Sequence, residues 1–253
     1  MKIICGSEVN KMDIWAYLVL YFTAFIGGIV QGISGFAFGI VILCVLPYFF
    51  TYVESLVILS FVSLFMLAVN SFVYRKHVVW KQLPASLTAF VVGTFFSVKL
   101  LKYTAGNPIW TKLLGAIFIV LAFYLLFCQG KIKIQPTVKN AVIFNGIAGI
   151  ISGLFGVGGP IAVLYFLAAL NTKEEYMSTI QFYCLFGVVF DFVIRVFNGM
   201  VNFSIIQFGL SCVGFVFLGL YVGKKLFERI DGLMLQKVIC CLMIFNGISL
   251  LVR

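Results

Sequence analysis

Two glycine-rich stretches hold the residues of this chain that are best suited to bind a small anion. One glycine pattern occurs twice, 121 residues apart, as Gly28-x-x-x-Gly32-x-x-Gly35 and Gly149-x-x-x-Gly153-x-x-Gly156. Glycine lowers the cost of non-helical backbone and lets the main chain approach a ligand closely. The free N–H groups at the start of a helix attract anions. A helix interrupted at each pattern would therefore bind an anion without a charged side chain.

The candidate binding residues are glycines of the two patterns, small polar neighbours and the glycine-proline run that follows the second pattern: Gln31, Gly32, Ser34, Gly35, Ser152, Gly153, Gly156, Gly158, Gly159 and Pro160. The alternative is that the glycines only allow helices to pack closely, as small residues spaced four apart do in membranes. Close packing does not require the run from Gly156 to Pro160, so we favour a binding site.

Four polar residues in otherwise apolar segments form a second group of candidates: Asn70, Gln181, Asp191 and Arg195. Asp191 and Arg195 are four residues apart and share a helix face, where they can pair. Arg195 could bind an oxyanion through two hydrogen bonds and Asp191 could carry a coupling proton. Alternatively, the two form a structural ion pair in which Arg195 extends to the membrane surface. Gln181 is a weaker candidate, because a lone amide more often makes a contact between helices.

The chain has none of the motifs that we associate with catalysis. It contains no phosphate-binding Walker loop, no Ser/His/Asp arrangement and no metal-ligand spacing, and its seven cysteines include no Cys-x-x-Cys pair. Cysteines inside apolar segments behave as small hydrophobic residues. We therefore expect no enzyme activity, no catalytic residue, no metal and no cofactor.

The composition points to an integral membrane protein. Of 253 residues, 63% are hydrophobic and 10% are charged, and the mean hydropathy is +1.15. Soluble domains carry about 25% charged residues, and a globule of this size cannot hide so much apolar surface from water. The net charge of +10 fits Lys and Arg in cytoplasmic loops near anionic lipids rather than nucleic-acid binding.

The hydropathy pattern predicts six ordinary membrane spans and two anomalous segments. The spans cover residues 53–74, 83–101, 109–128, 178–197, 203–223 and 233–252. Uncharged stretches at 14–50 and 141–170 are too long for one crossing and short for two, and each carries glycines in its middle. Broken backbone inside a membrane survives only where protein or a water-filled cavity pairs it. We expect half-helix hairpins or helices unwound in the middle.

The two glycine patterns fall in two copies of one unit. A second similarity links 93–100 to 219–226, so that 1–128 and 141–253 form repeats joined by a polar linker at 129–140. If each long segment enters and leaves on one face, each repeat has three full crossings and the repeats are inverted. This topology segregates Lys and Arg better than eight single crossings do. We thus predict an all-α polytopic membrane protein with two inverted repeats, each a broken hairpin plus three helices.

These residues resemble the sulfite exporter TauE/SafE family of membrane permeases. The resemblance rests on the two glycine patterns, on Gly158-Gly159-Pro160, and on Asn70-Ser71 before a basic turn, and it covers about 14–252. The first copy departs from the second, with Phe36-Ala37-Phe38-Gly39 in place of Val157-Gly158-Gly159-Pro160. This departure leaves open whether both repeats contribute equally to a site.

The resemblance implies secondary transport, with export as the expected direction, of small sulfur-containing anions such as sulfite or organosulfonates. The residues alone support a small anion carried by alternating access around the two breaks, in a plasma membrane. An anion channel and an uptake permease for another small anion are the alternatives. Expected partners are the anion, the lipid bilayer, a coupling proton and a second copy in a homodimer, with no nucleic acid.

Overall fold

The computed structural model describes residues 14–35, 37–104, 107, 109–127, 135–226 and 232–252. Residues 129–134 of the predicted linker lie outside the described residues, as does Phe36 in the first break. The described helices are α1 (Ile14–Ser34), α2 (Phe38–Leu43), α3 (Tyr52–Val73), α4 (Leu83–Tyr103), α5 (Ile109–Phe127), α6 (Val138–Phe155), α7 (Gly159–Ala169), α8 (Lys173–Phe197), α9 (Phe203–Leu226) and α10 (Gly232–Val252).

The protein is an all-α, multi-pass membrane protein, as predicted. Helices α3, α4, α5, α8, α9 and α10 occupy the six predicted spans. In the described chain, α1, α3, α4, α6, α8 and α9 are long and apolar enough to cross a membrane. Helix α8 starts earlier than predicted because the Thr172 hydroxyl accepts a hydrogen bond from the Glu175 N–H at 3.1 Å, which caps a charged first turn.

Each of the two anomalous segments has arms of unequal length. Helix α1 has 21 residues and α6 has 18, whereas α2 has 6 and α7 has 11. At 1.5 Å per residue, α1 alone is about 30 Å long, which is the thickness of the hydrocarbon layer. The expectation of half-helices therefore applies to the second arm of each segment and not to the first.

The chain forms two compact units, and each draws on both predicted repeats. The first unit comprises 1–55, 105–132 and 203–253, and it contains α1, α2, α5, α9 and α10. The second unit comprises 56–104 and 133–202, and it contains most of α3 together with α4, α6, α7 and α8. These units divide the chain differently from the repeats at 1–128 and 141–253, whose boundaries stay a prediction.

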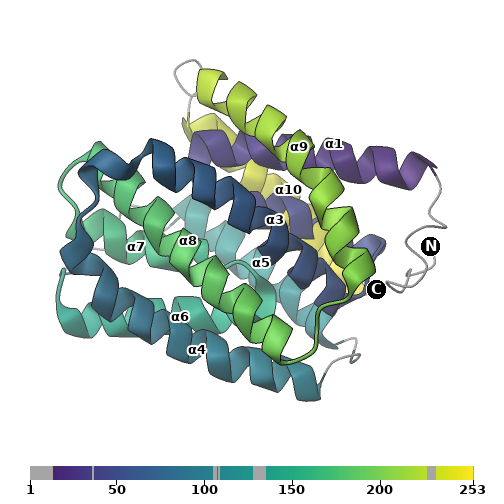
Figure 1. Ribbon diagram of the computed structural model, residues 1–253, viewed down its shortest axis with the longest axis horizontal. Coiled ribbons are helices and arrows are strands. Elements are labelled where there is room, and N and C mark those ends of the chain that lie inside the picture. Colours follow the sequence, from purple (N-terminus) through teal and green to yellow (C-terminus); the bar gives the residue numbers. More distant parts are fainter. Residues whose placement is uncertain are drawn as a thin grey trace. The chain divides into compact units, whose positions relative to one another are not determined.

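Each unit contains a tightly packed helix pair that brings glycines against a partner backbone. Helices α1 and α9 are side by side in the first unit, and α4 and α6 are side by side in the second (Figure 1). A Cβ added at Gly28 would meet the Val216 carbonyl, and one added at Gly149 would meet the Phe90 carbonyl. Both glycines are therefore required by the backbone of the partner helix.

The reverse contacts repeat in the same way. A Cβ added at Gly219 would collide with the Phe25 carbonyl, and one at Gly93 would lie 2.5 Å from the Gly146 carbonyl. Phe25 corresponds to Gly146 at the offset of 121, and Gly93 corresponds to Gly219 at the offset of 126. The same close approach thus occurs at corresponding positions in both units, which supports two copies of one packing motif.

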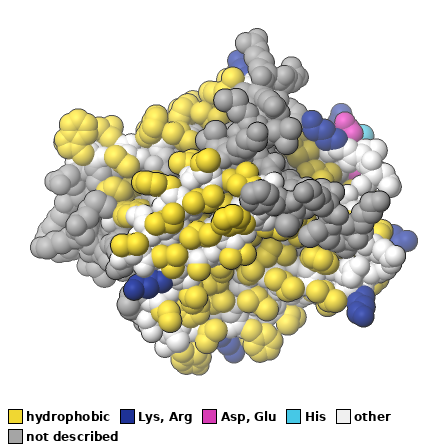
Figure 2. All heavy atoms as spheres, turned by 180° about the vertical axis from the view of Figure 1, so that it is seen from behind, with side chains coloured by type: hydrophobic (Ala, Val, Ile, Leu, Met, Phe, Trp, Pro, Cys, Tyr) yellow, Lys and Arg dark blue, Asp and Glu magenta, His cyan; other side chains and the backbone are white. Residues whose placement is uncertain are grey.

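Much of the described surface is apolar. Figure 2 shows hydrophobic side chains over one face, with Lys and Arg toward its margins. Large side chains such as Phe197 and Phe245 are 84% and 73% exposed. Such exposure is unfavourable in water and suits contact with lipid.

Gly149 and Gly146 offer a matched test of the glycine packing. We predict that Gly149→Ala destabilises the protein by about 1–3 kcal/mol, because the methyl group overpacks against the backbone at Phe90. A Cβ at Gly146 would have no heavy atom within 4 Å, so Gly146→Ala should be neutral or slightly stabilising. Unfolding of the purified protein in detergent measures both effects, and equal effects would contradict this packing.

Candidate functional site

The first break begins at Gly35, which ends α1 in a left-handed conformation. Its φ angle is 83° and its N–H donates to the Gln31 carbonyl at 2.8 Å. Side chains with a Cβ rarely adopt this conformation, whereas glycine adopts it at no steric cost. Gly35 therefore fixes where α1 stops and the chain turns toward α2.

The polar side chains of the first break hydrogen-bond to their own backbone. The Gln31 amide donates to the Gly35 carbonyl at 2.7 Å and accepts from the Phe38 N–H at 3.0 Å. The Ser34 hydroxyl accepts from the Ala37 N–H at 3.1 Å. The N–H groups that start α2 are thus already paired by two residues that the sequence suggested as ligand donors.

The second break has the same turn and a different continuation. Gly156 has φ 68°, and its N–H donates to the Ser152 carbonyl at 2.7 Å. Ser152 and Gly156 correspond to Gln31 and Gly35 at the offset of 121. At the position of Ser34, however, the second copy has Phe155, which lacks a hydroxyl group.

Helix α7 therefore begins without a side-chain cap. Gly158 is the N-cap residue of α7, and its carbonyl accepts hydrogen bonds from the N–H groups of Ile161 and Ala162 at 3.2 and 3.3 Å. Among the described residues, no side chain accepts a hydrogen bond from the N–H groups of Gly158 or Gly159. Pro160 presets the backbone for a helix start and carries no N–H of its own. Gly158 and Gly159 correspond to Ala37 and Phe38, whose N–H groups the first break pairs with side chains.

Two glycines of the candidate set lie in helix contacts. A Cβ at Gly32 would lie 3.1 Å from the Gly223 Cα and the Leu220 carbonyl. A Cβ at Gly153 would collide with the Ser97 hydroxyl. Helix packing, the alternative raised from the sequence, accounts for both positions. Gly158 also approaches α6 closely, because an added Cβ would meet the Ala148 carbonyl.

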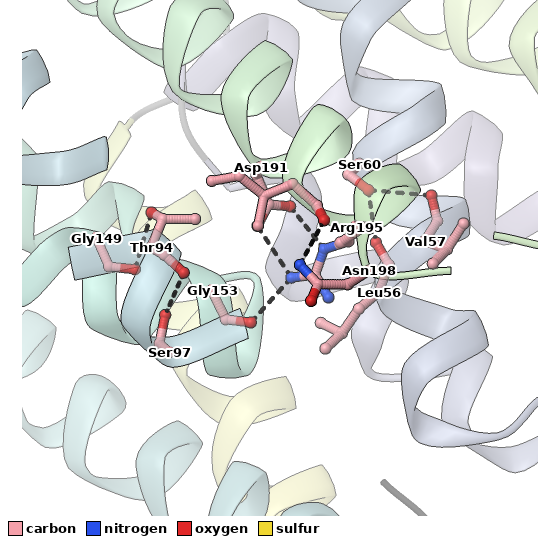
Figure 3. Close-up of polar contacts among 11 residues, drawn as sticks. Leu56, Val57, Ser60, Thr94, Ser97, Gly149, Gly153, Asp191, Arg195 and Asn198 are labelled. Carbon is pink, nitrogen blue, oxygen red and sulfur yellow. Dashed lines mark hydrogen bonds and ion pairs between the residues drawn. The ribbon is translucent and has the colours of Figure 1, made fainter. Parts of the chain in front are cut away.

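Asp191 and Arg195 form a buried, two-point ion pair on α8 (Figure 3). The Arg195 Nε donates to Asp191 Oδ2 at 2.9 Å and Nη2 donates to Asp191 Oδ1 at 3.0 Å. Arg195 is 0% exposed and Asp191 is 5% exposed. The alternative in which Arg195 extends to the membrane surface therefore does not hold.

The guanidinium of Arg195 also contacts the end of α6. Its Nη2 donates to the Gly153 carbonyl at 2.9 Å, three residues before Gly156 (Figure 3). The sequence suggested Gly153 for its N–H, and no local signal indicated that its carbonyl would meet a side chain 42 residues away. Thr94 and Ser97 on α4 were not predicted either; the Thr94 hydroxyl donates to the Gly149 carbonyl at 3.1 Å.

Several buried polar atoms of the second unit have no hydrogen-bond partner. They are Asn70 Oδ1, Ser71 Oγ, Ser86 Oγ, Asn145 Oδ1, Tyr183 OH and Arg195 Nη1. Asn70 and Gln181, the other two members of the second group of candidates, are each 2% exposed. All four members of that group are thus buried in the second unit. No three His, Cys, Asp or Glu side chains in the described ranges come together to hold a metal ion.

Comparison with known proteins yields one family and one curated relative. Residues 20–250 match the model of the family described as sulfite exporter TauE/SafE. Over 165 residues, the chain is 28% identical to a probable membrane transporter protein from Methanocaldococcus jannaschii. That match covers 59% of this chain and 61% of the relative, which is less than two thirds of its length. No solved structure matches the chain significantly.

Gln31 and Ser152 occupy corresponding positions in the two breaks. We predict that substitution of Gln31 destabilises the protein and that substitution of Ser152 does not. Gln31→Leu removes the acceptor of the Phe38 N–H and one hydrogen bond to the Gly35 carbonyl, so we expect a loss of about 1–3 kcal/mol. Ser152→Ala should change stability by less than about 0.5 kcal/mol. Unfolding in detergent tests the difference, and a tolerated Gln31→Leu would show that its amide does not hold the first break.

Proposed function

Since the chain belongs to the sulfite exporter TauE/SafE family, we propose that it is a secondary transporter that exports small sulfur-containing anions, such as sulfite or organosulfonates. The multi-pass architecture supports this proposal, as does the similarity to a probable membrane transporter protein. Neither observation names the anion or the direction. The identity of the anion and the direction of export are expectations from the family.

We place the anion at the start of α7, and a single observation carries this choice. Ser34 and Gln31 accept hydrogen bonds from the N–H groups of Ala37 and Phe38 in the break between α1 and α2, whereas no described side chain accepts from the corresponding N–H groups of Gly158 and Gly159. Helix N-termini in membrane transporters often face anionic groups of the substrate. An oxyanion would accept hydrogen bonds from the N–H groups of Gly158 and Gly159 and from the Ser152 hydroxyl.

The other candidate residues take supporting roles in this proposal. Gly156 sets the turn between α6 and α7, and Pro160 sets the backbone of the first helical turn. Gly153 allows α6 to approach α4, and Gly32 does the same for α1 and α9. Gln31, Ser34 and Gly35 hold the first break in shape, because their polar groups bond to the local backbone.

The transport cycle that we propose is alternating access around the two breaks. A short arm that follows a left-handed glycine can change direction through rotation at few residues, as hinge segments do. Helices α2 and α7 are such arms. If the repeats are inverted, equivalent motions of the two copies would open the protein to opposite sides in turn.

Gly156 and Gly199 provide a matched pair for testing the second break. Both have a left-handed φ, 68° and 69°, but Gly199 lies in the turn after α8 and an added Cβ there meets no atom within 4 Å. We predict that Gly156→Leu lowers sulfite flux in proteoliposomes to below about a tenth of wild type, which corresponds to ~1.4 kcal/mol. Gly199→Leu should retain most of the flux.

The same proteoliposomes distinguish a transporter from a channel. A secondary transporter shows saturable counterflow, in which unlabelled anion inside drives uptake of labelled anion, and a channel does not. Equal amounts of the variants in the membrane serve as the control for insertion. Unchanged flux in Gly156→Leu would exclude the second break from the transport path, and the absence of counterflow would exclude alternating access.

A further inference from the structure

We propose that Arg195 binds the transported anion through its Nη1 atom, and that its pairing with Asp191 makes the site select monovalent over divalent oxyanions. This inference rests on the proposed transport function and names the class of substrate. The preferred ligands are sulfonates and hydrogensulfite, in which three oxygens share one negative charge. Sulfate, with two charges, is the disfavoured ligand.

The Arg195 guanidinium has hydrogen-bond donors that the protein does not use. A guanidinium carries five N–H groups. The Nε group and the two groups of Nη2 are used by the Asp191 carboxylate and the Gly153 carbonyl. The two groups of Nη1 have no partner, although Arg195 is 0% exposed. A buried donor without an acceptor costs about 1–3 kcal/mol, and more when it is charged. An oxyanion supplies the missing acceptor.

The guanidinium lies beside the second break. Its bond to the Gly153 carbonyl attaches it to the last turn of α6, directly before the turn at Gly156. The uncapped start of α7 follows at Gly158. Two independent features that call for an anion, a free buried cationic donor and an open helix N-terminus, therefore occur at the same break.

The net charge of the site favours a monoanion. Asp191 and Arg195 are the only buried charged side chains among the described residues of the second unit, and their formal charges cancel. The remaining positive charge at the site is that of the N-terminus of α7, which is equivalent to about half an elementary charge. This charge can offset a monoanion in part, but it leaves most of a dianion uncompensated in a medium of low dielectric constant.

The experiment compares ethanesulfonate with sulfate on the full-length protein. Counterflow in proteoliposomes gives the affinity of each anion for wild type, for Asp191→Asn, for the double variant Asp191→Asn/Arg195→Gln and for Arg75→Gln. Arg75 is an exposed arginine that stacks on Phe72, so it controls for loss of a cation elsewhere. Wild type and Arg75→Gln should prefer ethanesulfonate by at least about tenfold.

The single and double variants should have different effects on anion binding. Asp191→Asn gives the site a net positive charge, so the preference should shrink at least about fivefold in favour of sulfate. The double variant removes both charges and therefore leaves no unpaired cation, so it tests Arg195 even if Asp191→Asn does not fold. It should bind both anions at least about tenfold more weakly.

Three results would overturn the inference. Equal affinity of wild type for the two anions would refute charge selection and leave the proposed transport function intact. A double variant with wild-type affinity would show that Arg195 does not contact the anion. Failure of wild type to transport either anion, or sulfite, would refute the proposed function and this inference with it.

Discussion

In the hydrocarbon layer of a membrane, every backbone N–H and C=O group needs a partner inside the protein, because no water is present to supply one. A helix satisfies this requirement along its length, and a break in a helix violates it locally. The first break pairs its free groups with the Gln31 amide and the Ser34 hydroxyl. The second break, at Gly156, lacks such caps and has the guanidinium of Arg195 beside it. The assignment of the anion site follows from this difference.

Close contact between helix backbones gives each break a firm support. Gly28 and Gly149 lie against the backbones of α9 and α4, at positions where a methyl group would not fit. Each compact unit therefore joins the long arm of one broken segment to a helix from the other half of the sequence. Within the second unit, α8 adds the Asp191–Arg195 pair to the same α6 helix. Motion of the short arm α7 would then occur against a closely packed background.

Local sequence signals predicted much of this structure. Apolar stretches of about 20 residues located the spans, and recurring glycines indicated that the two long segments are broken, as they are at Gly35 and Gly156. The spacing of Asp191 and Arg195 predicted their pairing, because residues four apart share a helix face. Contacts between segments that are far apart in the sequence could not be predicted from local signals. Nothing in the sequence near Gly153 indicates that its carbonyl accepts a hydrogen bond from Arg195. The polarity of Gln31 suggested that it donates to a ligand, whereas its amide donates to the backbone carbonyl of Gly35. The unequal arms also escaped prediction, since hydropathy does not locate a break within an uncharged stretch.

A crystal structure with bound 2-bromoethanesulfonate tests the central claim most directly, because anomalous scattering from bromine locates the ligand independently of its shape. We expect the sulfonate oxygens to lie within about 3 Å of the Gly158 or Gly159 nitrogen and of Arg195 Nη1. A ligand bound only at the break between α1 and α2, or an Arg195 Nη1 that donates to the protein while the sulfonate lies elsewhere, would contradict the account.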